Sequence, residues 1–136
     1  MKDWSDVPLR LGLGIVFIFH GLQKALGMLG GPGIDGFAKM LSGLGFNPAV
    51  PLAYLVTYIE LTGGLFLIIG LATKIVSVLL AIIMAVALFK VHLANGFSIM
   101  SGGYEYNLVI ICACITLFLA TPSKFCITKK YKYFVI

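Results

Sequence analysis

The chain has 136 residues, of which 60% are hydrophobic and 11% are charged, and its mean hydropathy is +1.06. Soluble domains average about 45–50% apolar and about 25% charged residues, so the polar side chains here are too few to cover a water-facing surface. The composition therefore excludes a soluble globular protein and indicates an integral membrane protein. The length predicts a single domain, residues 1–136.

The first two apolar runs predict helices that cross the bilayer in opposite directions. The first covers about residues 7–29, with Asp6 as a suitable N-cap and Pro8 in the first turn. The second covers about residues 51–72 and contains a single charge, Glu60. The glycine-rich residues between these runs favour a connecting loop.

Two further runs complete the pattern. The third covers about residues 75–94 and breaks at Asn95-Gly96, and the fourth covers about residues 104–121 and ends before Pro122. A basic tail, 122–136, follows. The sequence thus predicts an all-α protein, an integral membrane four-helix bundle.

Basic residues predict the orientation of this bundle. An even number of spans places both termini on one side of the membrane, and that side carries seven Lys and Arg residues: Lys2, Arg10, Lys74, Lys124, Lys129, Lys130 and Lys132. The opposite segments, 31–50 and 95–103, contain only Lys39. Both termini should be cytoplasmic by the positive-inside rule. The net charge of +5 is then explained by anionic lipid headgroups, and no nucleic-acid partner is expected.

Ionisable residues of all four spans fall toward the outer half of the membrane in this topology. They are His20, Lys24, Glu60, Lys90, His92 and Glu105. Unpaired charges at the bilayer centre cost about 2.5–3.5 kcal/mol on insertion scales, and the two lysines balance the two glutamates. The sequence therefore predicts a polar, substrate-binding pocket that opens toward the outer leaflet.

The spacing suggests how this pocket is arranged. His20 and Lys24 are four residues apart and share one helix face. Glu60 shares its face with Gly63 and Gly64, which let a neighbouring helix come close enough to pair with the carboxylate. Lys90 and His92 are about 200° apart on a helix, so only one of them should face the bundle.

Structural roles compete with this interpretation. The two lysines could snorkel to the outer interface, Glu105 could be a helix N-terminal charge, and His20 could be a hydrogen-bonded packing residue. The cysteines form no C-x-x-C pair, so Cys112 and Cys114 are interpreted as packing residues. Two lysines close to the histidines and glutamates argue against a metal site.

Several segments, taken together, resemble the DoxX family. These are His20-Gly-Leu-Gln-Lys24, Gly36-Phe-Ala38, Glu60-Leu-Thr-Gly-Gly64, Gly70-Leu-Ala-Thr-Lys74, His92-Leu-Ala-Asn-Gly-Phe97 and Gly102-Gly-Tyr-Glu-Tyr-Asn-Leu108. The resemblance covers about residues 8–122. It implies a small four-helix protein of the bacterial inner membrane, in a family whose members include a subunit of thiosulfate:quinone oxidoreductase and a membrane component of an oxidative-stress complex.

From these observations we expect a redox-associated membrane protein that binds a quinone or another small oxidisable molecule in the pocket, with a redox partner protein. No haem, flavin or dinucleotide motif is present, so no built-in cofactor is expected. A non-catalytic assembly or binding module, in which ion pairs only fix helix register, stays open as an alternative. So does a small-molecule or proton-coupled carrier, which would need a homo-oligomer to enclose a path. Whether the chain is itself an enzyme stays open.

Overall fold

The computed structural model describes residues 4–120, and these residues contain helices, turns and loops but no strand. The α-helices in this range are α1 (Val7–Leu26), α2 (Gly33–Gly43), α3 (Ala49–Ile69), α4 (Thr73–Ala87) and α5 (Glu105–Leu119). The chain continues from α4 through a π-helical turn, η1 (Leu88–His92), and two short 3-10 turns, η2 (Leu93–Asn95) and η3 (Ile99–Ser101). The predicted all-helical class is confirmed.

Three helical segments in the described part of the chain are long and apolar enough to cross a membrane. They are α1 with 20 residues, α3 with 21 and the continuous segment Thr73–Asn95 with 23. Helix α5 is also apolar but has 15 residues, which correspond to about 22 Å, less than the hydrocarbon core of about 30 Å. The structure thus supports a membrane helical bundle with at least these three spans. The predicted basic tail, 122–136, lies outside the described residues.

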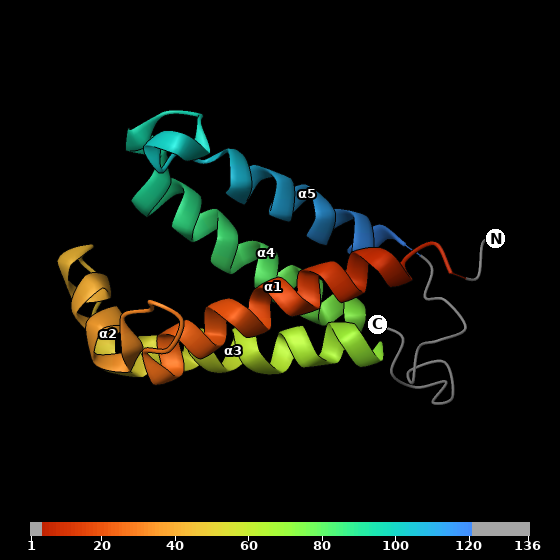
Figure 1. The fold of residues 1–136 in the computed structure, drawn as a ribbon, viewed down its shortest axis with the longest axis horizontal. Coiled ribbons are helices and arrows are strands. Elements are labelled where there is room, and N and C mark those ends of the chain that lie inside the picture. Colours follow the sequence, from red (N-terminus) through yellow and green to blue (C-terminus); the bar gives the residue numbers. More distant parts are fainter. Residues whose placement is uncertain (1–3, 121–136) are drawn as a thin grey trace.

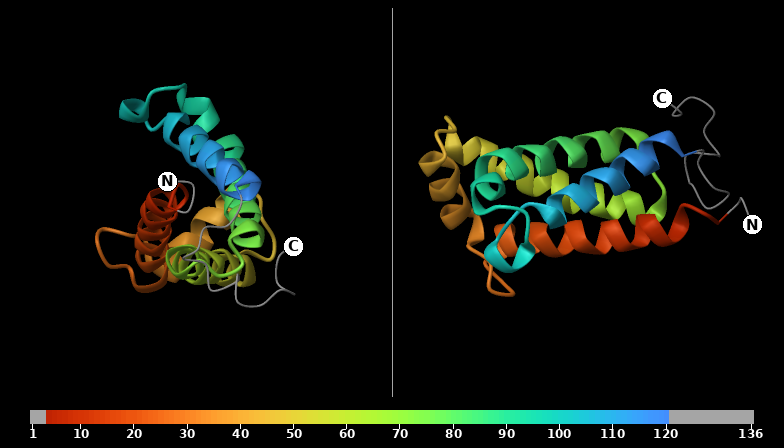
Figure 2. Two further views of the ribbon diagram at one scale, coloured as in Figure 1. Left: turned by 90° about the vertical axis from the view of Figure 1, so that its right-hand side faces the viewer. Right: turned by 90° about the horizontal axis from the view of Figure 1, so that it is seen from above.

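The helices form two antiparallel pairs (Figure 1). Helices α1 and α3 lie side by side, and α4 and α5 form a second pair that packs on α3 and, less closely, on α1 (Figures 1 and 2). We call the end of the bundle that carries α2 and the 88–104 connection the loop end. The opposite end, with Val7 and Gly70, is the terminal end.

Glycines allow α1 and α3 to approach closely. A Cβ atom built on Gly14 would lie 2.7 Å from the carbonyl oxygen of Gly64, and one built on Gly64 would lie 2.7 Å from that of Gly14. Such contacts are shorter than van der Waals distance, so only glycine fits at both positions without moving the backbone. The predicted role of Gly64 in close helix packing is confirmed, whereas Gly63 faces Val76 and Leu80 of α4.

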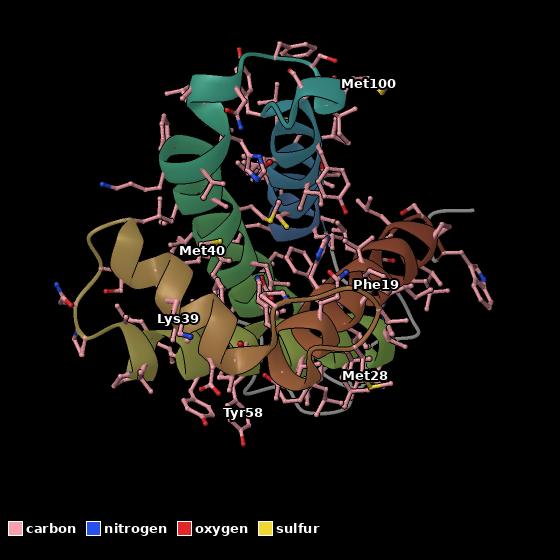
Figure 3. The ribbon with its side chains drawn as sticks, turned by 60° about the vertical axis from the view of Figure 1, so that its left-hand side comes forward. Phe19, Met28, Lys39, Met40, Tyr58 and Met100 are labelled. Carbon is pink, nitrogen blue, oxygen red and sulfur yellow. The ribbon has the colours of Figure 1, made fainter. Side chains whose placement is uncertain are left out.

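Two groups of buried side chains hold the helices together. The main core joins both helix pairs and includes Phe17, Leu67, Leu80 and Cys114. A smaller core lies beneath α2, where Phe37, Ala38 and Leu41 pack against Ala53 of α3. Tyr58 and Phe19 instead project outward from α3 and α1 (Figure 3), as expected for helix faces that meet lipid.

Helix α2 was not expected from the sequence, which suggested a loop across residues 31–50. Its apolar residues Ile34, Phe37, Ala38 and Leu41 follow the i, i+3, i+4, i+7 spacing of an amphipathic helix. Because glycines flank this short pattern, the sequence favoured a loop instead. Helix α1 also ends earlier than predicted, because Gly27 adopts φ +65° and terminates it.

Candidate ligand-binding site

Glu60, in the middle of α3, forms an ion pair with Lys24 near the end of α1. The distance from Lys24 Nζ to Glu60 Oε1 is 2.5 Å. The Glu60 side chain is 2% exposed and that of Lys24 is 20% exposed. The carboxylate is therefore buried among the helices, while the Lys24 side chain is partly exposed. The predicted pairing of Glu60 with a basic residue inside the bundle is confirmed.

Helix α2 covers this ion pair. The Lys24 ammonium nitrogen lies 4.8 Å from the centroid of the Phe37 ring, close enough for a cation–π interaction. Phe37 is buried in the core beneath α2. The pair consequently sits where α1, α2 and α3 meet, at the loop end of the bundle.

Two buried oxygen atoms of α3 have no hydrogen-bond partner among the described residues. They are Glu60 Oε2 and Thr57 Oγ1. Since the two residues are three positions apart, they lie on the same side of the helix. A buried polar atom left without a partner costs about 1–3 kcal/mol, and such atoms often mark the position of a bound water or ligand. An ionised carboxylate accepts hydrogen bonds and a hydroxyl can both donate and accept, so this part of the site is suited to a ligand with a donor group.

His20 lies one turn before Lys24 on α1 but has different neighbours. Its Nδ1 is 3.2 Å from Gln23 Oε1, and Gln23 Nε2 in turn donates to the carbonyl of Leu29 at 3.0 Å. The imidazole also makes edge contacts with the rings of Phe19 and Tyr106, at centroid distances of 6.0 and 6.2 Å. His20 therefore links α1 to α5 beside the ion pair, and no direct contact between His20 and Glu60 is found within residues 4–120.

The remaining three predicted site residues, Lys90, His92 and Glu105, make other contacts at the loop end. His92 Nδ1 lies 2.7 Å from the carbonyl oxygen of Gly102, and the Glu105 carboxylate accepts a hydrogen bond from the Ile99 amide at 2.8 Å. Both contacts fix the 88–104 connection, from whose tip Met100 projects (Figure 3). Lys90 is exposed, with its ammonium 5.8 Å from the centroid of the Phe46 ring. Of the six predicted residues, the structure joins Lys24 with Glu60 and places His20 next to them.

Sequence reasoning missed the structural role of Arg10. This side chain is 2% exposed; its Nε donates to the carbonyl of Leu67 at 2.9 Å, and its Nη2 donates to that of Ile68 at 3.3 Å. Nη1 forms an ion pair with Asp6 at 3.4 Å. The Asp6 carboxylate therefore pairs with Arg10, and Asp6 makes no side-chain cap at the start of α1, contrary to expectation. The signal available in the sequence was the i, i+4 spacing of these two opposite charges.

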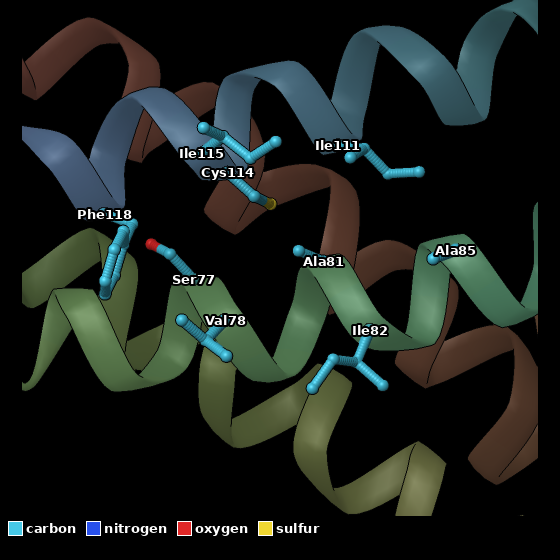
Figure 4. Close-up of a pocket in the computed structure, with 9 residues that line it drawn as sticks. All are labelled: Ser77, Val78, Ala81, Ile82, Ala85, Ile111, Cys114, Ile115 and Phe118. Carbon is cyan, nitrogen blue, oxygen red and sulfur yellow. The ribbon is translucent and has the colours of Figure 1, made fainter.

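An apolar groove lies between α4 and α5 (Figure 4). Its volume is about 290 Å³, and its walls include Ala81, Ile111 and Phe118. The Ser77 hydroxyl donates to the carbonyl of Thr73 at 2.6 Å, so it is already paired within α4. The buried Cys114 side chain belongs to this wall, which agrees with a packing role for it.

Within residues 4–120, no group of three or more His, Cys, Asp and Glu side chains is arranged to hold a metal ion. The Lys24–Glu60 pair itself offers hydrogen bonding and proton exchange.

Comparison with known proteins gives the chain a family. The sequence matches the DoxX family over residues 5–93, which include α1 to α4 and both residues of the ion pair. It is also 36% identical over 117 residues to the Bacillus subtilis (strain 168) protein named "Putative oxidoreductase CatD", covering 86% of this chain and 78% of that protein. No solved structure matches the chain significantly. The matched range and this level of identity show that the chain belongs to the DoxX family.

Proposed function

We propose that this protein is a redox-associated membrane protein that binds a quinone-type or other small oxidisable molecule at the Lys24–Glu60 site. The observation that carries the proposal is the buried Glu60 carboxylate, which is held by Lys24 through one oxygen while the other oxygen has no partner among the described residues. A purely structural ion pair is expected to satisfy both of its oxygens. The name of the Bacillus subtilis relative, an oxidoreductase, is consistent with redox work.

Physical reasoning connects the site to this class of ligand. Quinones and their reduced forms present carbonyl or hydroxyl groups on a flat apolar ring, so they need a few polar partners within apolar walls. Lys24, Glu60 and Thr57 supply the polar groups, and Phe37 with the core beneath α2 supplies the apolar surroundings. No residue is assigned a catalytic role in this proposal. Electrons would be exchanged with a partner protein or with the quinone pool.

Ligand binding tests the proposal directly. The purified protein in lipid nanodiscs is equilibrated with duroquinone and, separately, with duroquinol under anaerobic conditions, with empty nanodiscs as a control for partition into lipid. We expect wild type to bind at least one form, and Lys24→Ala and His20→Ala to weaken that binding, with a loss of stability of no more than about 2 kcal/mol. Lys39→Ala, on the exposed face of α2, should leave binding unchanged.

The competing function is an assembly module without a ligand. What favours it is that both ion pairs seen within residues 4–120 involve α1, so they could serve only to fix how this helix packs against α3. Absence of binding of either quinone form to wild type, together with strong destabilisation by both Lys24→Ala and His20→Ala, would replace our proposal with this one.

The proposed topology has four spans, with α5 as the fourth and both termini in the cytoplasm of a bacterial cell. In this arrangement the terminal end faces the cytoplasm and the loop end, with the Lys24–Glu60 pair, lies toward the outer leaflet of the inner membrane. The support comes from the sequence, in which the segments predicted on the side of the two termini carry seven basic residues against one in the opposite segments. A short α5 can be accommodated by local thinning of the bilayer or by association of copies.

Reporter fusions test this orientation. A reporter that is active only in the cytoplasm should be active when fused after Ile136 and inactive when inserted at Gly43, where the structure leaves open space. The reverse pattern would place the loop end and the ion pair on the cytoplasmic side. Activity at both positions would show an odd number of spans and remove α5 from the membrane-crossing set.

A further inference from the structure

We propose that the site prefers the reduced, hydroxyl-bearing form of its ligand, a hydroquinone-type molecule, over the oxidised, carbonyl-bearing form. The inference rests on the proposed function and specifies which redox form the site recognises. Its basis is the balance of unused hydrogen-bonding groups around the Lys24–Glu60 pair.

The acceptors of the site are open. Glu60 Oε2 and Thr57 Oγ1 are both buried and both lack partners among the described residues. Next to an ammonium group, the carboxylate oxygen of Glu60 is an acceptor only, so it calls for an O–H or N–H from the ligand. A quinone carbonyl oxygen placed there would be repelled, because it and Glu60 Oε2 are both acceptors.

The donors of the site are partly engaged. Lys24 Nζ donates to Glu60 Oε1 and faces the Phe37 ring. His20 Nδ1 is within hydrogen-bond distance of Gln23 Oε1, and Gln23 Nε2 donates to the Leu29 carbonyl. The Thr57 hydroxyl and the remaining N–H groups of Lys24 could donate to either form of the ligand, so the preference rests on Glu60 Oε2, which only the hydroxyl-bearing form can satisfy with a hydrogen bond.

The surroundings also define the charge and shape of the ligand. An anionic ligand would bring negative charge to the open carboxylate oxygen, which is unfavourable in a buried site. Lys24 is the more exposed member of the pair, and the buried Phe37 ring lies beside its ammonium group. These features fit a neutral, hydroxyl-bearing aromatic ring.

The preference can be measured on the intact protein. Dissociation constants of duroquinol and duroquinone are determined anaerobically by equilibrium dialysis against wild-type protein in nanodiscs, with empty nanodiscs subtracted. A hydrogen bond to a charged acceptor corresponds to about a tenfold or greater gain in affinity. We therefore expect duroquinol to bind about tenfold or more tightly than duroquinone.

Two substitutions locate the preference at the site. In Glu60→Gln an amide N–H can occupy the position of Oε2, so the preference for duroquinol should disappear or reverse. Glu105→Gln is the matched control, because the Glu105 carboxylate is bonded to the Ile99 amide in the 88–104 connection, and it should keep the preference. Should Glu60→Gln fail to fold, Thr57→Val still removes one open oxygen and should weaken duroquinol binding. Its control is Thr62→Val, whose hydroxyl is exposed and already bonded to the Tyr58 carbonyl.

Each result decides a different point. Binding of neither form by wild type would overturn the proposed function and this inference together. Equal affinities, or tighter binding of duroquinone, would overturn the inference while the proposed function stands. A preference that survives in both Glu60→Gln and Thr57→Val would show that duroquinol binds elsewhere, and would overturn the assignment to this site.

Discussion

The two ends of the α1–α3 pair each hold a buried ion pair, but they use it differently. At the terminal end, the Arg10 guanidinium donates to Asp6 and to the carbonyls of Leu67 and Ile68. Toward the loop end, Lys24 binds one oxygen of Glu60 and the other oxygen has no partner among the described residues.

This difference separates a structural charge from a candidate binding charge. The Arg10 guanidinium binds the C-terminal turn of α3, where helix carbonyls lack the usual i+4 amide partner, although the Gly70 N–H also donates to the Leu67 carbonyl. Several hydrogen bonds thus offset the cost of burying its charge. The Glu60 carboxylate keeps an unused acceptor at a similar degree of burial. The Arg10 guanidinium, which donates from all three of its nitrogens, stabilises the fold, whereas the open oxygen of Glu60 is positioned to receive a ligand.

The largest expected effect is the loss of Arg10. Arg10→Met removes the ion pair with Asp6 and leaves the Leu67 and Ile68 carbonyls without their side-chain donor. The free energy of unfolding in detergent should fall by about 3–5 kcal/mol, the usual cost of breaking a buried pair. Lys39→Met, on the exposed face of α2, should change it by less than about 0.5 kcal/mol. Similar effects of the two substitutions would contradict the structural role of Arg10.

The next largest loss of stability is expected at Gly14 and Gly64, where α1 and α3 approach each other closely. Gly14→Ala or Gly64→Ala would place a methyl group 2.7 Å from a backbone oxygen of the facing helix. Because backbone cannot move aside easily, each substitution should cost about 1–3 kcal/mol and separate α1 from α3. Gly12→Ala is the control, since a Cβ there has nothing within 4 Å. Thermal unfolding of the three variants measures the difference. If Gly12→Ala destabilised as much as the other two, tight packing would not explain the effect.

A smaller loss of stability is expected when the Lys24–Glu60 pair is broken, and a second substitution should restore most of it. Lys24→Met leaves Glu60 buried without its cation and should cost about 1–2 kcal/mol, less than at Arg10 because the lysine is partly exposed. The double substitution Lys24→Met with Glu60→Met removes both charges and should recover most of that stability, while quinone-type binding stays lost. Unfolding titrations and ligand dialysis on the same samples separate the two readouts. A double variant as unstable as Arg10→Met would show that this pair, too, is structural.

Much of the architecture follows from the sequence because a segment that crosses a membrane must hydrogen-bond its own backbone groups, and an apolar helix does so. The long apolar runs and the turn residues at Gly70 and Asn95 therefore predicted helical segments that the structure contains. Helix α2 could not be identified in the same way. Its 11 residues carry only four apolar side chains at helical spacing, between glycine-rich flanks, and the burial of these side chains depends on Ala53 and other residues of α3.

The site was predictable only where two residues had few alternatives. Glu60 is the one charge in its span, so it needed a cation from a neighbouring helix, and the structure supplies Lys24. His92 and Glu105 had another option, because both lie close to loop backbone that offers hydrogen bonds. The sequence alone cannot tell these two situations apart, since they depend on how far the α4–α5 pair stands from α1 at the loop end.

The smallest expected effect tests that last point. Lys90, which the sequence placed in the pocket, lies exposed over the Phe46 ring, and an exposed cation–π contact is worth about 0.5–1 kcal/mol. Lys90→Met should therefore lower stability by no more than this and leave ligand affinity unchanged, in contrast to Lys24→Met. Phe46→Leu removes the same contact, so adding it to Lys90→Met should cost less than the sum of the two single changes. If Lys90→Met abolished binding, the α4–α5 pair would have to close onto the Lys24–Glu60 site when ligand is present. The loop end would then form one wide pocket rather than a site of three helices.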